Sequence, residues 1–143
     1  MKKVIFAAGL TAVLLITSGC DDKAATEDGP ETVPVEWVIA EVQKDQATML
    51  DLLDEKSKAL DPEDEADNDL TIENYKLTEW KADDDRYFYE IVYEHPEKSR
   101  MVTERMEVIQ VEDGWKRTTY SDLSNFDTFV ADLQPEVLKE MYK

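Results

Sequence analysis

The chain has 143 residues, with 34 Asp and Glu against 16 Lys and Arg, so its formal net charge at pH 7 is −18. This charge repels polyanions, which excludes nucleic acid as an electrostatic partner. One cysteine, one histidine and four glycines argue against a disulfide, a transition-metal site and a glycine-rich phosphate loop. We therefore expect no cofactor, no metal ion and one small domain with a single core.

The first 20 residues have the layout of a secretory leader. Two lysines precede an apolar run over residues 4–16, and the small residues 17–19 lead to Cys20. The apolar run is shorter than the roughly 20 residues of a membrane span. The segment resembles the lipobox of bacterial lipoproteins. That resemblance implies cleavage before Cys20, diacylglycerol attached to its sulfur, and an anchor on the extracytoplasmic face of the cell membrane.

The sequence after the leader divides into a tether and a folded part. Removal of residues 1–19 takes away two lysines and no acid, which changes the net charge from −18 to −20. Residues 20–33 contain the lipidated cysteine and an acidic stretch too polar to pack, so we expect a disordered tether. Residues 34–143 form the predicted domain, which starts at Pro34, a residue suited to a first helical turn.

Helical spacing dominates the first part of this domain. The repeat predicts either one bent helix or two helices, because Lys44-Asp45-Gln46 interrupts it. Pro62 ends the helical run. Residues 61–69 alternate acids, but Ala66 and Ile72 occupy places where a calcium loop of the EF-hand type needs glycine and glutamate. We expect an acidic loop there and no metal site. The apolar positions of the repeat are Val35, Val38, Ile39, Val42, Met49, Leu50 and Leu53.

Alternation replaces helical spacing from residue 71 to residue 120. It predicts four strands, and Asp113-Gly114 is typical of a tight turn between the last two. Beyond them, Ser124 and Asp127 form a capping-box pair that predicts a helix, and a last helix is expected from Pro135 to Tyr142. The four predicted strands span residues 71–80, 86–94, 100–111 and 115–120.

This order predicts an α+β fold in which N-terminal helices pack on a bent four-stranded antiparallel meander, with C-terminal helices. The segments PVEWVI (34–39), MLDLL (49–53) and EDGWK (112–116) resemble small bacterial lipoproteins with a nuclear transport factor 2-like (cystatin-like) domain. The resemblance implies a sheet that wraps the helices into a cone. Such cones often hold a small ligand, and some are enzymes that use a carboxylate with a tyrosine. A helix-on-sheet domain of the inhibitor-like cystatin type is the alternative fold.

Five aromatic residues are the candidate contacts for a ligand or partner: Trp37, Trp80, Tyr87, Tyr89 and Trp115. Large aromatic side chains usually belong to the core, and alternating tyrosines along a strand are typical of sheet packing. The functional alternative is that some of them line the mouth of the cone. His95, which precedes Pro96 in a predicted turn, is expected to be solvated.

We expect a membrane-anchored extracytoplasmic lipoprotein that binds a small ligand or an unknown envelope protein and has no enzymatic activity. Two alternatives remain open. One is a structural or secretion-accessory envelope lipoprotein without a ligand. The other is an enzyme that uses a pocket carboxylate and a tyrosine, which requires a buried acid with a raised pKa beside a tyrosine hydroxyl.

Overall fold

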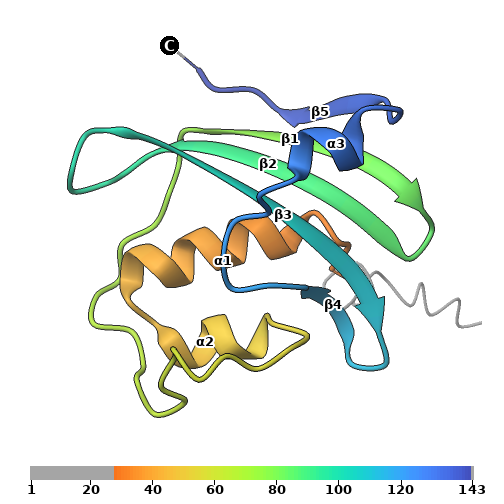
Figure 1. Cartoon of the computed structure of the whole chain (residues 1–143). Helices are drawn as coiled ribbons and strands as arrows, with labels where there is room; N and C mark the ends of the chain where they lie inside the picture. Colours follow the sequence, from red (N-terminus) through yellow and green to blue (C-terminus); the bar gives the residue numbers. More distant parts are fainter. Residues whose placement is uncertain (1–27, 143) are drawn as a thin grey trace, which may run out of the picture.

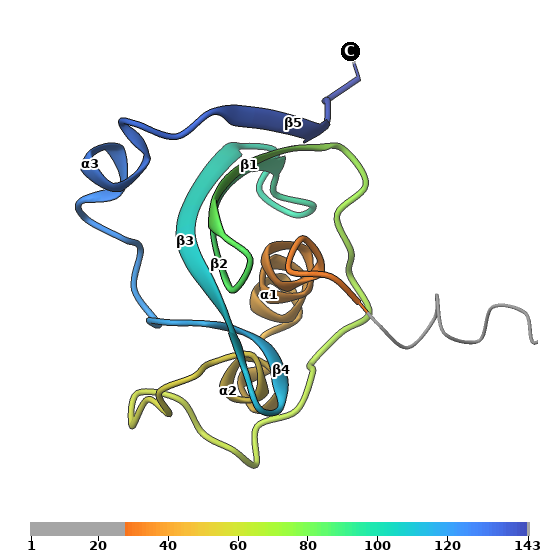
Figure 2. The same cartoon turned by 90° about the vertical axis from the view of Figure 1, so that its right-hand side faces the viewer.

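The structure, a computed structural model, describes residues 28–142. A curved antiparallel sheet of five strands, in the order β4-β3-β2-β1-β5, wraps around helix α1 (Figures 1 and 2). The predicted leader, Cys20 and most of the predicted tether lie outside the described residues. Within residues 28–142, every helix is too short or too polar to cross a bilayer. The α+β class is confirmed.

Two helices form the N-terminal layer. Helix α1 (Thr32–Gln43) ends at Lys44, which adopts a left-handed conformation with φ 56°, and α2 (Gln46–Asp51) starts directly afterwards. The side chain of Asp45 caps α2 by accepting a hydrogen bond of 2.9 Å from the backbone N–H of Thr48. The interruption therefore produces two helices. Val33 is buried, so the packed domain begins inside the range assigned to the tether.

The strands follow the predicted alternation with shifted ends. The second strand agrees with its prediction, β1 begins and ends later, and β4 is shorter than expected. β4 pairs with β3 as far as Arg117, and the other edge of Arg117 bonds to the segment after α2. The Arg117 N–H donates to the Leu52 carbonyl at 2.7 Å, and its carbonyl accepts from the Asp54 N–H at 2.9 Å. The four strands are β1 (Tyr75–Asp83), β2 (Arg86–Glu94), β3 (Met101–Val111) and β4 (Gly114–Arg117).

The C-terminal part differs from the prediction of two helices. Helix α3 (Phe126–Val130) is short and lacks a side-chain cap, so the capping box does not form. The last segment is strand β5 (Pro135–Lys139), which pairs antiparallel with β1. The prediction of a helix there was wrong because the edge of β1 offers unpaired backbone groups, and Pro135 fits the first position of a strand.

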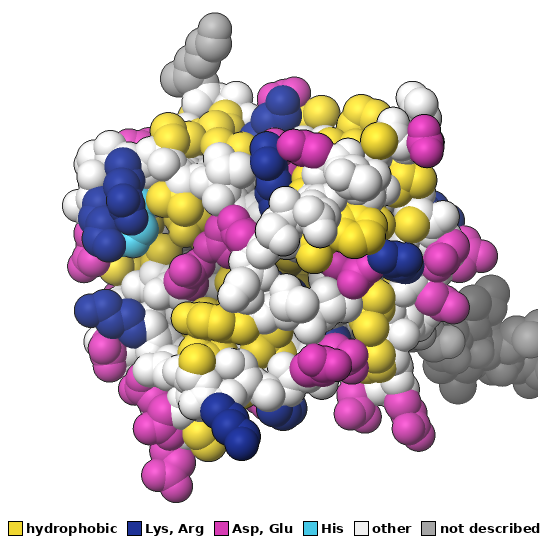
Figure 3. All heavy atoms as spheres, viewed as in Figure 1, with side chains coloured by type: hydrophobic (Ala, Val, Ile, Leu, Met, Phe, Trp, Pro, Cys, Tyr) yellow, Lys and Arg dark blue, Asp and Glu magenta, His cyan; other side chains and the backbone are white. Residues whose placement is uncertain are grey.

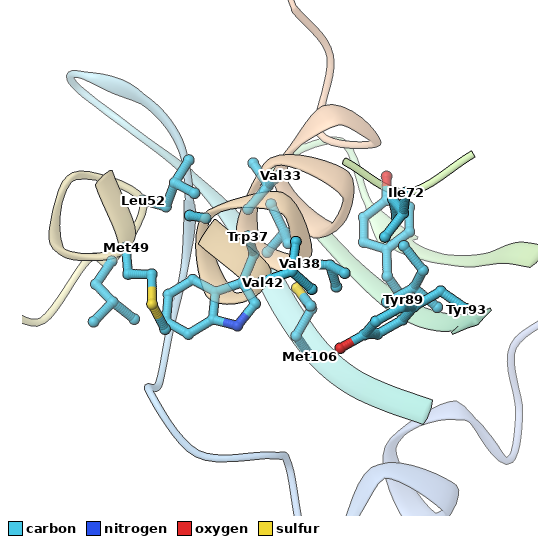
Figure 4. Packing of buried hydrophobic residues seen from close by; sticks show 14 of the residues in the cluster. Val33, Trp37, Val38, Val42, Met49, Leu52, Ile72, Tyr89, Tyr93 and Met106 are labelled. Atoms are coloured by element: carbon cyan, nitrogen blue, oxygen red, sulfur yellow. The ribbon is translucent and has the colours of Figure 1, made fainter. Parts of the chain in front are cut away.

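The sheet separates two apolar clusters. On its concave face, Trp37, Val38 and Val42 of α1 point toward the strands (Figure 4). On its convex face, beside α3, Phe88 and Phe126 are buried with their ring centroids 6.2 Å apart. The main core is therefore on the concave side.

Candidate functional site

A polar pocket of about 260 Å³ lies between the C-terminal end of α1 and the loop that joins β2 to β3. We call it the Glu41 pocket. The two sides of the pocket are 49 or more residues apart in the sequence, and the fold brings the C-terminal end of α1 and the β2–β3 loop to the same end of the molecule (Figure 1). Its charged and polar walls are formed by Glu41, Lys44, Tyr93, His95, Glu97, Lys98 and Arg100.

The rim of the pocket is basic. Lys44, Lys98 and Arg100 line it, and within residues 28–142 none of these three forms a salt bridge. Figure 3 shows Lys and Arg side chains beside the histidine, at the end of the molecule where Figure 1 places the β2–β3 loop. In a chain with more than twice as many acids as bases, this gathering of unpaired cations creates a local field that favours anions.

The β2–β3 loop that carries two of these cations is fixed by its own hydrogen bonds. The His95 N–H donates to the Arg100 carbonyl at 2.8 Å, and the Ser99 N–H donates to the His95 carbonyl at 3.1 Å. His95 Nδ1 accepts from the backbone N–H groups of Glu97 and Lys98. Burial lowers the pKa of His95, with Lys98 acting in the same direction, so the acceptor nitrogen stays unprotonated at neutral pH. His95 thus organises the loop.

Glu41 lines the pocket and is paired with a second carboxyl group, that of Glu104, which is not part of the lining. Part of the Glu41 side chain is exposed, but burial of its carboxyl group, together with a hydrogen bond to Glu104, raises the pKa of Glu41 from 4.5 to about 8. Two carboxyl groups that share a hydrogen bond repel each other strongly when both are ionised, so the pair holds one proton at neutral pH. Glu41 therefore presents a protonated acid in the pocket.

Tyr93 adds a second neutral hydrogen-bond donor to the wall. Its side chain is only 2% exposed, and among the residues that the structure describes its hydroxyl has no hydrogen-bond partner. Burial raises the pKa of Tyr93, with the negative charges of Glu41 and Glu104 acting in the same direction. The hydroxyl therefore stays protonated, and it remains free to donate to a bound molecule.

A buried arginine, Arg117, contacts the carboxyl pair from the interior of the domain. Arg117 is 1% exposed, and its Nη1 donates to Glu104 at 3.1 Å while its Nε donates to the Thr119 carbonyl at 2.6 Å. Its guanidinium lies 4.2 Å from the ring centroid of Trp37. These contacts hold Glu104 in place on β3, so the carboxyl pair has one fixed member.

The five predicted contact residues do not form one surface. Trp37 and Tyr89 are 1% and 0% exposed and belong to the concave core, so neither faces a ligand. Trp80 lies on the convex face, 5.2 Å from the ring of Phe126. Tyr87 and Trp115 pack edge to face at 5.4 Å and remain partly exposed near the β3–β4 hairpin. None of the five lines the Glu41 pocket.

Another tyrosine near a carboxyl group, Tyr89, lies toward the opposite end of α1. Its hydroxyl donates a hydrogen bond to Glu79 on the neighbouring strand. Burial raises the pKa of Glu79, while the hydrogen bond from Tyr89 opposes that rise. Because the tyrosine is fully buried and its donor is already used, this pair satisfies itself and offers less to a ligand than Tyr93 does.

Sequence analysis missed the Glu41 pocket. Its acids and bases are scattered from residue 41 to residue 104 in a chain that is 35% charged, so no local pattern distinguishes them. Lys44 gave the one available signal, because it stands where the end of a helix usually has glycine.

Metal chemistry and known relatives add nothing to this geometry. Within residues 28–142, no group of three or more His, Cys, Asp or Glu side chains is arranged to hold a metal ion. Comparison of the chain with protein-family models, curated proteins and solved structures gave no match. The function of the chain is therefore inferred from its own residues.

Proposed function

We propose that this chain is a membrane-anchored extracytoplasmic lipoprotein that binds a ligand in the Glu41 pocket and does not transform it. The observation that carries the binding role is the set of unpaired basic side chains around a pocket with a protonated donor on Tyr93. Uncompensated charge of the minority sign is costly to gather in a small domain without a partner for it, which favours a site.

The position of the pocket suits a tethered receptor. The described chain enters α1 at its N-terminal end, and the pocket lies beyond the C-terminal end. A helix of 12 residues is about 18 Å long. A lipid on Cys20 would therefore hold the domain by the end opposite to the pocket, and the pocket would remain open to solutes and to envelope proteins.

A family relationship to lipoproteins with a nuclear transport factor 2-like domain is part of the proposal. The wrapped sheet and the helix inside it agree with the cone that such a domain implies. The cone is largely filled by α1, which favours a second candidate function, that of a structural or secretion-accessory lipoprotein without a ligand.

The enzymatic alternative has some support in the pocket and less than binding has. Glu41 supplies an acid with a raised pKa, and Tyr93 lies close to it. Both groups are protonated at neutral pH, so they are suited to donate hydrogen bonds, and neither is suited to remove a proton from a substrate. We expect any bound ligand to be recovered chemically unchanged.

The membrane address is tested by expressing the full chain in a bacterium and separating membranes from soluble protein. We expect the protein in the membrane fraction, with acyl chains on its N-terminal Cys20 detected by mass spectrometry. Cys20→Ser should abolish the acyl mass and release the folded domain from membranes, whereas Asp22→Ser, a matched change beside it, should not. A native protein without acyl chains would refute the anchor.

A further inference from the structure

We infer that the Glu41 pocket recognises a multivalent oxyanion of metabolite size, bound by Lys44, Lys98 and Arg100 and by the hydroxyl of Tyr93. The inference rests on the proposed binding function and adds the class of ligand. Its chemistry is that of a polycarboxylate or a phosphate monoester, which share several acceptor oxygens and at least two negative charges.

The donors and acceptors of the pocket determine this class. Lysine and arginine only donate, and a tyrosine hydroxyl without a partner also offers a donor. The Nδ1 acceptor of His95 is already occupied by backbone N–H groups. Glu97 adds one carboxyl acceptor to the lining, so donors still outnumber free acceptors. A cation or a donor-rich sugar would leave donors unsatisfied, whereas an oxyanion accepts from them.

Backbone strain supplies an independent observation. Among residues 28–142, Lys44 and Ser99 are the only non-glycine residues with positive φ, at 56° and 46°. Lys44 lines the pocket, and Ser99 stands between Lys98 and Arg100. A left-handed conformation is unfavourable for residues with a Cβ, and such strain tends to gather at functional sites. One strained residue of the described chain therefore lines the pocket, and the other lies in the loop that carries Lys98 and Arg100.

The size of the pocket limits the ligand. Its volume of about 260 Å³ lies just below the range of about 300–1,000 Å³ typical of sites for drug-sized molecules. A metabolite with two or three charged groups fits this space. A polyanion such as nucleic acid extends beyond this space, and the net negative charge of the chain repels it.

The closing experiment measures binding of citrate and of glycerol phosphate by titration calorimetry, with the full chain purified in detergent. In about 50 mM NaCl we expect a Kd below about 1 mM for at least one of the two. The preferred probe distinguishes the carboxylate source from the phosphate source. Lys98→Met and Arg100→Met should each weaken binding at least about tenfold. Lys76→Met, which removes the same charge from the convex face, should change the Kd less than about twofold.

Two glycine variants separate binding from stability. Lys44→Gly removes both strain and charge, so it should raise Tm by a few degrees and weaken the anion at least about fivefold. Ser99→Gly removes strain alone, so it should raise Tm without a comparable loss of affinity. The inference would be overturned if neither anion gave a heat of binding, or if Lys76→Met and Lys98→Met lost the same affinity for the anion. The assay does not depend on acylation of Cys20, so its failure is distinct from failure of the membrane address.

Discussion

The two faces of the sheet are made by the same three long strands but are covered by different means. On the concave face, α1 and the strands form a continuous cluster around Trp37, Tyr89 and Met106. On the convex face, Phe88 and Phe126 form a small aromatic cluster, and Arg105 Nε bonds to Glu90 across the strands at 2.7 Å. Exposed ion pairs contribute little, so we conclude that the concave face supplies most of the stability.

Truncation of one aromatic residue on each face gives the largest expected effect. Trp37→Ala should lower the free energy of unfolding by about 3–5 kcal/mol, because it leaves a cavity in the concave core and removes the ring beside Arg117. Phe129→Ala on the convex face should cost about 1 kcal/mol or less, because Phe129 is already 44% exposed. Urea unfolding measures both losses in the free energy of unfolding, provided that the m-value stays unchanged. Similar losses for the two variants would contradict the comparison.

The long strands of the sheet are the part of the fold that the sequence predicts best. β2 agrees with residues 86–94 because apolar and polar side chains alternate along it and because turns bound it on both sides. β5 was mistaken for a helix because Val137, Leu138, Met141 and Tyr142 also fit helical spacing. Its partner β1 lies more than 50 residues earlier, and a local pattern carries no information about an edge so distant in sequence.

The candidate site could be predicted least. The aromatic residues chosen from sequence are the ones that hydrophobicity places in a core, and Trp37 and Tyr89 lie there. The groups of the pocket owe their properties to tertiary contacts. The pKa of Glu41 is raised because the curvature of the sheet brings Glu104 to the end of α1. Sequence does suggest Lys44, because the turn after α1 needs a left-handed residue and the chain supplies a lysine there.

The carboxyl pair makes stability depend on pH. Glu41 loses its proton near pH 4.5 when unfolded and near pH 8 when folded, so the folded state binds more protons between these values. Stability should therefore fall as the pH rises from about 5 to 8, by on the order of 1–2 kcal/mol after allowance for solvent screening at this partly exposed group. The raised pKa values of Glu36, Glu79 and Asp122 act in the same direction.

Glu41→Gln tests this dependence, because an amide cannot titrate. The variant should show a flatter stability curve between pH 6 and pH 8 in urea unfolding, while Glu55→Gln in the exposed loop after α2 should leave the curve unchanged. A curve for Glu41→Gln that follows the unmodified protein through this range would show that the pocket carboxyl groups are not the source of the slope.

The edge strand β5 provides a smaller test. Asn74 clasps the C-terminal segment with two hydrogen bonds, since its Nδ2 donates to the Tyr142 carbonyl at 3.0 Å and its Oδ1 accepts from the Tyr142 N–H at 3.0 Å. Asn74→Ala should cost about 1 kcal/mol, because these bonds are exposed to water. Amide hydrogen exchange should speed up in β5 and stay slow in β2 and β3. Unchanged protection of β5 would show that its backbone pairing with β1 suffices.

Salt should have the smallest effect on stability, because it acts on the charged surface and not on the concave core. A chain whose net charge is −20 after loss of residues 1–19 repels itself, and added ions screen that repulsion. Raising NaCl from about 20 to 200 mM should stabilise the protein by less than about 1 kcal/mol, which scanning calorimetry detects as a rise in Tm. Glu112→Lys, which adds positive charge in the β3–β4 turn, should weaken this dependence, and Lys76→Glu should strengthen it. A Tm that falls over this range would mean that the ion pairs on the convex face outweigh the diffuse repulsion, and the low value assigned to that face would then be wrong.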